Sequence, residues 1–198
     1  MRLWWNYKWS PELTLGGGLS GGILEVEESA TQAYEQALGR MTYSATDKLS
    51  FELDGGIELR QTDETARATP VFSLTGTYLP FAATQLQLSA YRHVENSAVF
   101  VGEDYTATGV KLEARHTWRG SYDLILAAAY EHSDYQTVSG SSGPSRQDNA
   151  FVVRPAVQCK LRSWAQVELF CEYRHNASTL GRFSFRDSQV GLQVTFAF

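Results

Sequence analysis

The sequence predicts an all-β fold, a transmembrane antiparallel up-and-down β-barrel, and three observations point to it. Apolar and polar residues alternate with a period of two along most of the chain, which is the periodicity of strands and not of helices. Short turns and longer polar segments follow one another alternately. Aromatic residues, 13% of the chain, gather beside the short turns. Together these features are typical of a barrel that crosses a membrane with its strands.

The clearest alternation lies in residues 49–60. Apolar residues and one glycine occupy the odd positions, and the even positions include the charged residues Glu52, Asp54, Glu58 and Arg60. A face with four charges cannot lie in a dry core. We expect eleven strands, several of which reach the about 9–11 residues needed to cross a bilayer at a tilt. They are expected at residues 2–9, 13–25, 32–44, 49–61, 68–78, 84–94, 105–118, 122–132, 149–162, 165–174 and 184–198.

One segment is ambiguous. Residues 28–38 are rich in helix formers, but a helix there would deprive the neighbouring strands of a partner, so we interpret the segment as part of a strand.

The connections differ at the two ends of the strands. Short turns are expected near Ser10-Pro11, Thr46-Asp47, Pro80–Ala83, Arg119-Gly120 and Ser163-Trp164, and longer polar segments at 26–31, 62–67, 95–104, 133–148 and 175–183.

Ten aromatic residues are placed near the expected short turns, as an interfacial belt requires. They are Tyr7, Trp9, Tyr43, Tyr78, Phe81, Trp118, Tyr122, Trp164, Phe196 and Phe198.

The bulk composition excludes some classes of protein. The 198 residues carry a net charge of −5, which gives no reason to expect a nucleic-acid partner. Mean hydropathy is −0.29, and no stretch approaches the about 18 consecutive apolar residues of a membrane helix. A barrel is compatible with these values because its strands alternate between lipid and lumen. The N-terminal residues MRLWWNYKWSPELTL lack the apolar run and cleavage site of a signal peptide.

The last residues carry a further signal. Val190, Leu192, Val194, Phe196 and Phe198 repeat at every second position up to the terminal aromatic. This ending resembles the signal by which the outer-membrane assembly machinery recognises its clients. Residues 34–61 (YEQALGRMTYSATDKLSFELDGGIELRQ) and 182–198 (RFSFRDSQVGLQVTFAF) also resemble the repeated hairpins of bacterial outer-membrane porins, in particular the β-barrel porin 2 group.

The resemblance implies a location in the bacterial outer membrane, with the C-terminus and the short turns on the periplasmic side. The partners would be outer-membrane lipids and the barrel-assembly machinery, which would bind the C-terminal strand. Bacterial single-chain barrels have even strand numbers, and eleven is odd. We therefore expect residues 1–198 to form one barrel domain that lacks at least one N-terminal strand and the signal peptide, with 12 or more strands in the complete protein.

Three motifs that could carry chemistry have simpler interpretations. Gly16–Gly21 matches G-x-G-x-x-G, but no helix pattern follows it, so a dinucleotide site is not expected. His132 near Asp134, and His175 near Ser178, suggest a hydrolase only by proximity in sequence, which does not build a catalytic site. We expect no enzyme activity, no metal site and no cofactor.

Cys159 and Cys171 lie on consecutive expected strands with the same parity. A turn centred on Ala165 would place them opposite each other, in reach of a disulfide. A shorter register would move them two pairs apart and out of reach. The sequence leaves both possibilities open.

Charged residues on the polar faces are the candidate pore lining. We expect the later strands to be mainly basic and the earlier ones acidic, which would create a transverse field in a pore. The function expected from this set is a porin-like channel for small hydrophilic solutes. The alternative is a structural or accessory barrel in envelope or surface-polysaccharide export, with no open pore; a soluble β-sandwich is a more distant third. The set consists of Glu52, Asp54, Glu58, Arg60, Lys111, Glu113, Arg115, Arg154, Lys160, Arg162, Glu168, Glu172, Arg174 and Arg186.

Overall fold

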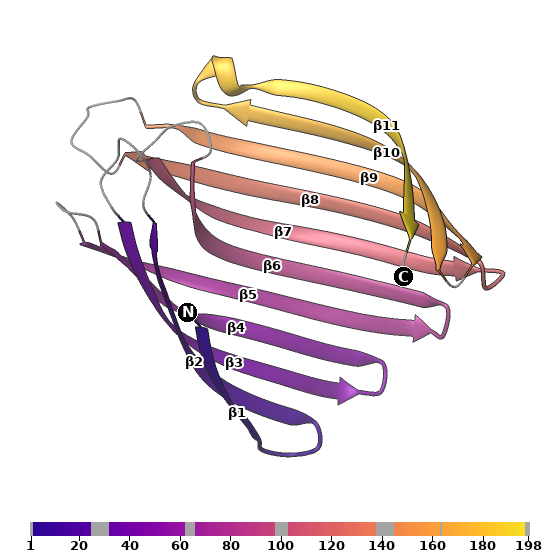
Figure 1. Ribbon diagram of the computed structural model, residues 1–198, viewed down its shortest axis with the longest axis horizontal. Helices are drawn as coiled ribbons and strands as arrows, with labels where there is room; N and C mark the ends of the chain where they lie inside the picture. The colour runs from indigo at the N-terminus through magenta and orange to yellow at the C-terminus, as the bar shows by residue number, and fades with distance from the viewer. Residues whose placement is uncertain are drawn as a thin grey trace.

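The computed structural model describes residues 2–24, 32–61, 66–97, 103–137, 145–162 and 164–196. They form one antiparallel sheet of eleven strands whose spatial order equals their chain order, which confirms the predicted up-and-down topology (Figure 1). A 3-10 turn, η1 (Gly181–Phe183), precedes the last strand. The strands are β1 Arg2–Lys8, β2 Leu13–Leu24, β3 Gln32–Thr46, β4 Leu49–Gln61, β5 Ala66–Phe81, β6 Thr84–Asn96, β7 Glu103–Trp118, β8 Tyr122–Thr137, β9 Gln147–Arg162, β10 Ala165–Ser178 and β11 Phe185–Phe196.

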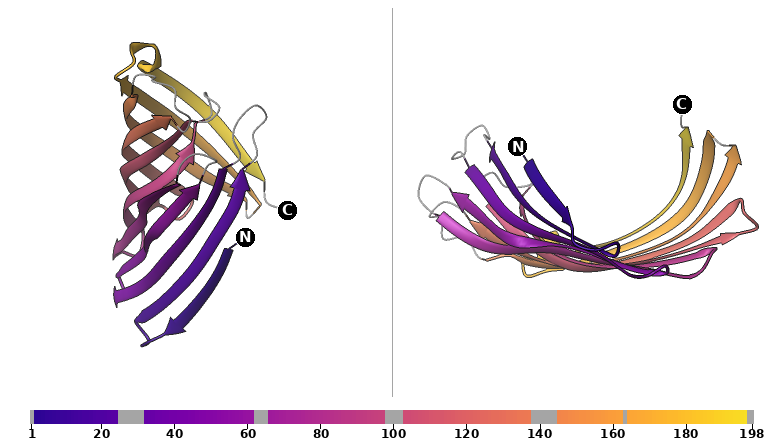
Figure 2. Two further views of the ribbon diagram at one scale, coloured as in Figure 1. Left: turned by 90° about the vertical axis from the view of Figure 1, so that its left-hand side faces the viewer. Right: turned by 90° about the horizontal axis from the view of Figure 1, so that it is seen from below.

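The sheet is curved into a trough, and its two edge strands rise on the same side (Figure 2). Within the described sheet, β1 pairs only with β2, and β11 pairs only with β10. The described sheet is therefore an open part of a barrel wall. The described residues include no helix that is long and apolar enough to cross a membrane.

The register assigns every strand residue to one of two faces. Residues that pair directly across strands share a face, and the face changes at each step along a strand. The inner face, on the concave side, carries most of the charges, including Asp54, Lys111 and Glu168. The outer face carries the apolar residues, such as Leu112 and Leu192. The predicted alternation is thus confirmed over the middle of the strands.

In five cross-strand pairs, an aromatic ring comes within 3.4 Å of the position that a Cβ on the opposite glycine would take. A Cβ on Gly109 would lie 2.7 Å from the Tyr91 ring, and one on Gly191 would lie 2.4 Å from the ring of Phe170. The glycines therefore let the rings lie flat on the neighbouring strand, which pins register and curvature. The pairs are Trp4/Gly18, Tyr34/Gly22, Phe51/Gly76, Tyr91/Gly109 and Phe170/Gly191.

Four of the five predicted short turns are confirmed, and Ser163 of the fifth lies outside the described residues. The turn between β7 and β8 contains Arg119 at φ 51° and Gly120 at φ 71°. Positive φ at consecutive turn positions matches the twist of the flanking strands, which makes this a tight hairpin. In the turn between β1 and β2, the Ser10 hydroxyl accepts hydrogen bonds from the backbone N–H groups of Glu12 and Leu13, at 3.2 and 3.1 Å.

At the short turns, the predicted strand ends lie within one residue of the observed ones, except that β3 and β5 extend two and three residues further, to Thr46 and Phe81. At the long-loop ends, the predictions for β5–β10 are too short. β8 extends to Thr137 instead of 132, and β10 to Ser178 instead of 174. The ambiguous segment forms strand from Gln32 onward, and residues 28–31 lie outside the described residues. Phe198 also lies outside them, so the described part of the terminal signal ends at Phe196.

The register between β9 and β10 decides the question of the cysteines. Cys159 pairs with Val167, and Cys171 pairs with Val190 of β11. The turn therefore adopts the shorter of the two registers, and both cysteines are free thiols. The register shifts between Ala165 and Gln166, where Arg162 pairs with Ala165.

Candidate functional site

The outer face carries a band of exposed apolar side chains. Leu88, Leu112 and Leu192 are 58%, 48% and 68% exposed at the middle of their strands. The band covers about nine residues of a typical strand, which at a tilt of about 35–45° gives close to the about 25 Å of a transmembrane barrel. An apolar surface of this extent is not compatible with water around it.

Aromatic residues border this band at the short-turn end, as predicted. Trp9, Phe81 and Trp164 are 69%, 73% and 51% exposed. Neighbouring rings contact one another: Trp118 lies 6.0 Å from Tyr122, and Trp164 stacks on Phe196 at 6.0 Å, centroid to centroid. Nine of the ten predicted aromatic residues are described, and all of these are exposed. Large amphipathic rings at one depth suit a membrane–water interface.

A hollow lies on the inner face of β7–β10. Its volume is about 310 Å³, and its floor is formed by small residues including Ala127 and Ala129. Around the floor stand charged side chains: Lys111, Glu113, Arg115, Arg154, Glu168 and Glu172. The structure therefore brings together six of the predicted pore-lining residues.

Ion pairs connect the charges around this hollow. Arg154 lies 2.5 Å from Glu168 and 3.5 Å from Glu172, and its guanidinium stacks over the Phe170 ring at 4.2 Å. Arg174 also pairs with Glu172. Each buried carboxylate thus has a cation beside it, as a charge near a low-dielectric wall requires.

A second set of pairs lies toward the short-turn end. Asp123 is only 2% exposed and holds Lys160 at 3.2 Å and Arg115 at 3.6 Å. Lys111 pairs with Glu113 at 3.2 Å. The Lys111 and Lys160 side chains are each 50% exposed, so their ammonium groups reach into the space inside the trough. Exposed charges on the face opposite the apolar band require water there.

A separate cluster occupies the inner face near β1–β4. The Arg40 guanidinium donates two hydrogen bonds to the Asp54 carboxylate, at 2.7 and 2.8 Å, and lies over the Trp4 ring at 4.0 Å. Further toward the long-loop end, Glu58 is 2% exposed and pairs with Arg60 at 2.8 Å. Glu52 is exposed on the same face.

Two parts of the sequence-based description of the lining are wrong. Arg186 pairs with His175 and has the parity of Val190 and Leu192, so it lies on the outer face near the long-loop end. The expected basic wall also does not form, because the inner face of β9–β11 places Glu168, Glu172 and Asp187 among its cations. Acidic and basic side chains are mixed on the inner face of these three strands, so a field between an acidic and a basic wall is not supported.

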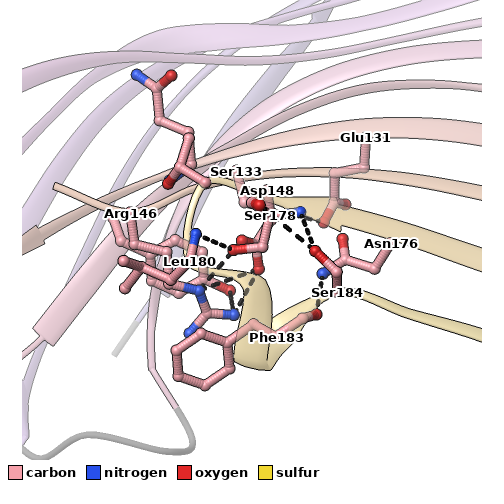
Figure 3. A network of polar contacts seen from close by, with 12 residues as sticks. Glu131, Ser133, Arg146, Asp148, Asn176, Ser178, Leu180, Phe183 and Ser184 are labelled. Atoms are coloured by element: carbon pink, nitrogen blue, oxygen red, sulfur yellow. Dashed lines mark hydrogen bonds and ion pairs between the residues drawn. The ribbon is translucent and has the colours of Figure 1, made fainter.

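A network at the long-loop end was not anticipated (Figure 3). The Arg146 side chain pairs with Asp148 and stacks over the rings of Tyr135 and Phe183, at 4.0 and 3.7 Å. Asn176 donates a hydrogen bond of 2.8 Å to the Phe183 carbonyl. This network fixes η1 to the ends of β8–β10. It could not be predicted because its members come from segments whose sequence is typical of loops.

Among the described residues, no group of three or more His, Cys, Asp and Glu side chains is arranged to hold a metal ion. His132 and His175 lie on the outer face, outside the hollow. The glycines at positions 16–21 lie within strand β2.

No family model matches the chain, and no curated protein matches it in sequence. Solved structures of OmpT, an outer membrane protein of Vibrio cholerae, are similar in fold. The in-vitro folded protein aligns over 98% of this chain and 63% of that chain, with a TM-score of 0.59 and 14% identity. A loop L8 deletion mutant aligns over 99% of this chain and 62% of that chain, with a TM-score of 0.56 and 16% identity. The chain thus has the fold of an outer-membrane β-barrel and spans less than two thirds of the length of these proteins.

Proposed function

We propose that this chain lies in the bacterial outer membrane as part of a porin-like channel, through which small hydrophilic solutes pass passively. The observation that carries the proposal is the division between the two faces. The outer face has an apolar band of bilayer height, and the inner face keeps Lys111, Arg115 and Lys160 at 50%, 39% and 50% side-chain exposure. A sheet with this division separates lipid from water, and a channel wall must do the same.

The barrel closes, in this proposal, through further strands between β1 and β11. The outer strand edges carry backbone N–H and C=O groups that have no partner in the described sheet. Such groups are not tolerated against hydrocarbon, so both edges need a strand beside them. The odd number of strands and the greater length of the similar solved structures support additional strands over direct pairing of β1 with β11.

The orientation follows from the two kinds of connection. In bacterial barrels the short turns are periplasmic and the long loops extracellular. We therefore assign to the periplasmic side the tight turns that join β3 to β4, β5 to β6 and β7 to β8. The C-terminal end of β11 lies on the same side. Val190, Leu192, Val194 and Phe196 would then be presented to the assembly machinery. The resemblance to the β-barrel porin 2 group is part of the same proposal.

Planar-bilayer recording of the full-length protein, after its gel mobility has been compared before and after boiling, tests this function. A compact unboiled form that gives discrete conductance steps would support a channel. A compact form without steps would favour the alternative, a structural or accessory barrel in envelope or polysaccharide export.

A matched pair of variants locates the conducting face. Ala127 and Ala128 both border the hollow, but the register places the Ala128 side chain on the opposite face, between Leu112 and Val153. Ala127→Trp is expected to lower the unitary conductance, whereas Ala128→Trp adds a ring on the lipid side and leaves it unchanged. An effect of Ala128→Trp alone would contradict the assignment of the faces.

A further inference from the structure

The sheet splits between β5 and β6 at the long-loop end. Their ladder starts beside the turn, at Phe81 and Thr84, and its last pair is Phe72 with Arg92. The ladders on either side, β4–β5 and β6–β7, continue to the ends of their strands. The paired part of β5 is about ten residues long, which is what a strand needs to cross the bilayer. The split therefore begins where the hydrocarbon ends.

Beyond the split, the inner face of β4–β5 contacts the outer face of β6–β8. Arg67 donates hydrogen bonds to the Thr106 hydroxyl at 2.8 Å and to the Gln136 side-chain oxygen at 2.5 Å. Arg60 donates to the Asn96 side-chain oxygen at 2.5 Å. Inner-face side chains of β4–β5 can reach outer-face side chains of β6–β8 only if the ends of β6–β8 bend toward the inside of the trough. The bent ends then lie on the inner side of β4–β5.

The burial along β7 supports this bend. Asp104 and Thr106 are 4% and 3% exposed, whereas Val110 and Leu112, on the same face of the same strand, are both 48% exposed. Asp104 lies 3.7 Å from Arg60 and 3.4 Å from Arg67. The outer face of β7 thus changes from lipid-facing and apolar to protein-covered and polar at the split. Arg60 and Arg67 hold the bent segment in place through Asp104, and they are positioning residues.

The inner face of β6–β8 carries carboxylates held by tyrosines, Glu131 at the split and Glu95 beyond it. The Tyr91 hydroxyl donates to Glu131 at 2.8 Å, its ring crossing over Gly109. The Tyr105 hydroxyl donates to Glu95 at 2.6 Å. Among the described residues, the only ion pair of Glu95 is with His93, at 3.0 Å. Glu131 accepts hydrogen bonds from Tyr91 and Ser133 and forms no ion pair with a described Lys or Arg. This region differs from the hollow of β7–β10, where each carboxylate has a cation beside it.

We propose that the inward-bent ends of β6–β8 form the constriction of the channel, and that Glu95 and Glu131 make this constriction select cations over anions. The inference rests on the proposed channel function and adds its solute class. Carboxylates at a narrow point, next to a low-dielectric wall, lower the energy of a passing cation and raise that of an anion. The hydrogen bonds from Tyr91 and Tyr105 fix the position of both carboxylates.

Reversal potentials of the full-length channel in a KCl gradient test this proposal. The wild-type potential is expected to have the sign of cation selectivity, and Glu131→Gln and Glu95→Gln are each expected to shift it toward zero. Glu52→Gln removes the same charge from the inner face of β4, away from the bend, and serves as the matched control. An anion-selective or unselective wild-type channel would overturn the proposal and leave the channel function standing. An equal shift in the Glu52→Gln control would also overturn it.

The position of the constriction is tested separately. Arg67→Gln removes one of the two cations at Asp104 and should loosen the bend, so that liposomes admit larger uncharged sugars than with the wild-type protein. Arg67→Lys retains the charge and should restore most of the wild-type size limit. An unchanged size limit in Arg67→Gln would place the constriction elsewhere. A folded barrel that conducts no ions at all would refute the channel function itself.

Discussion

Leu88 and Gln87 offer a direct comparison of the two faces, because they are consecutive residues on β6. Leu88 is 58% exposed on the outer face, between Gly76 and Leu112. It lies four residues from the start of its strand. At about 3.4 Å per residue and the tilt of a barrel strand, this places it about 10 Å into a band about 25 Å high, close to the midplane. Leu88→Arg is therefore expected to cost about 2–4 kcal/mol, or roughly 30- to 700-fold in the folding equilibrium.

The Gln87→Arg variant places the same charge on the inner face, between Thr77 and Glu113. It faces water and gains an acidic neighbour, so a change within about 0.5 kcal/mol is expected. Folding of both variants into lipid vesicles, followed by gel mobility across a urea series, measures the two free energies. Equal losses in the two variants, or a harmless Leu88→Arg, would refute the assignment of Leu88 to lipid.

Three further substitutions or measurements test local features. Gly109→Ala would place a Cβ 2.7 Å from the Tyr91 ring and 2.8 Å from the Tyr130 carbonyl, so we expect urea unfolding to show a loss of about 1–3 kcal/mol in the free energy of unfolding. Gly17→Ala is the control and should be neutral, because nothing lies within 4 Å of its Cβ position. Arg154→Met leaves Glu168 and Glu172 without this partner and should lower the free energy of unfolding by about 1–2 kcal/mol at pH 7. This is less than for a fully buried pair, because water screens the charges in the lumen. A loss of stability that persists at a pH where both carboxylates are protonated would indicate a packing effect instead. Cys159 and Cys171 should both remain free thiols under mild oxidation, as counted by mass spectrometry of the alkylated protein, and a disulfide between them would show that the register of β9 and β10 is wrong.

The fold could be predicted because the period-two pattern reports a local property. A strand between lipid and water must alternate, and each short turn starts a new strand. The strand ends were underestimated for the same reason: beyond the apolar band, His132 and Asp134 on β8, and His175 on β10, replace apolar residues on the outer face. The loss of alternation there looks like a loop in the sequence, although the ladder continues outside the hydrocarbon.

The charged residues that line the inner face could be predicted only in part, because the ion pairs between them depend on the register of the strands. Alternation places Lys111 and Glu168 on the inner face, but it does not reveal which charge meets which. Arg186 shows the limit: it was assigned inward from its charge, although its parity with Leu192 places it on the outer face. Asp123 was missed because its partners, Arg115 and Lys160, come from the two neighbouring strands.

The bend in β6–β8 could not be predicted because it depends on contacts between non-neighbouring strands. Arg67 on β5 meets Thr106 on β7 and Gln136 on β8. Nothing local marks residues 66–71 as unpaired with β6, and the segment alternates like the rest of its strand. Only the three-dimensional arrangement reveals that polar outer-face residues there are covered by protein.

Spin-label accessibility along β7 is the measurement that tests the two-faced membrane wall most directly. Single labels placed in turn at residues 110–117 of the full-length protein in lipid vesicles would be probed with oxygen, which concentrates in the bilayer, and with a water-soluble nickel complex. We expect both signals to alternate with a period of two and opposite phase, with oxygen favouring Val110, Leu112 and Ala114 and nickel favouring Lys111, Glu113 and Arg115. Nickel access at every position, or no alternation, would show that this sheet does not separate lipid from water.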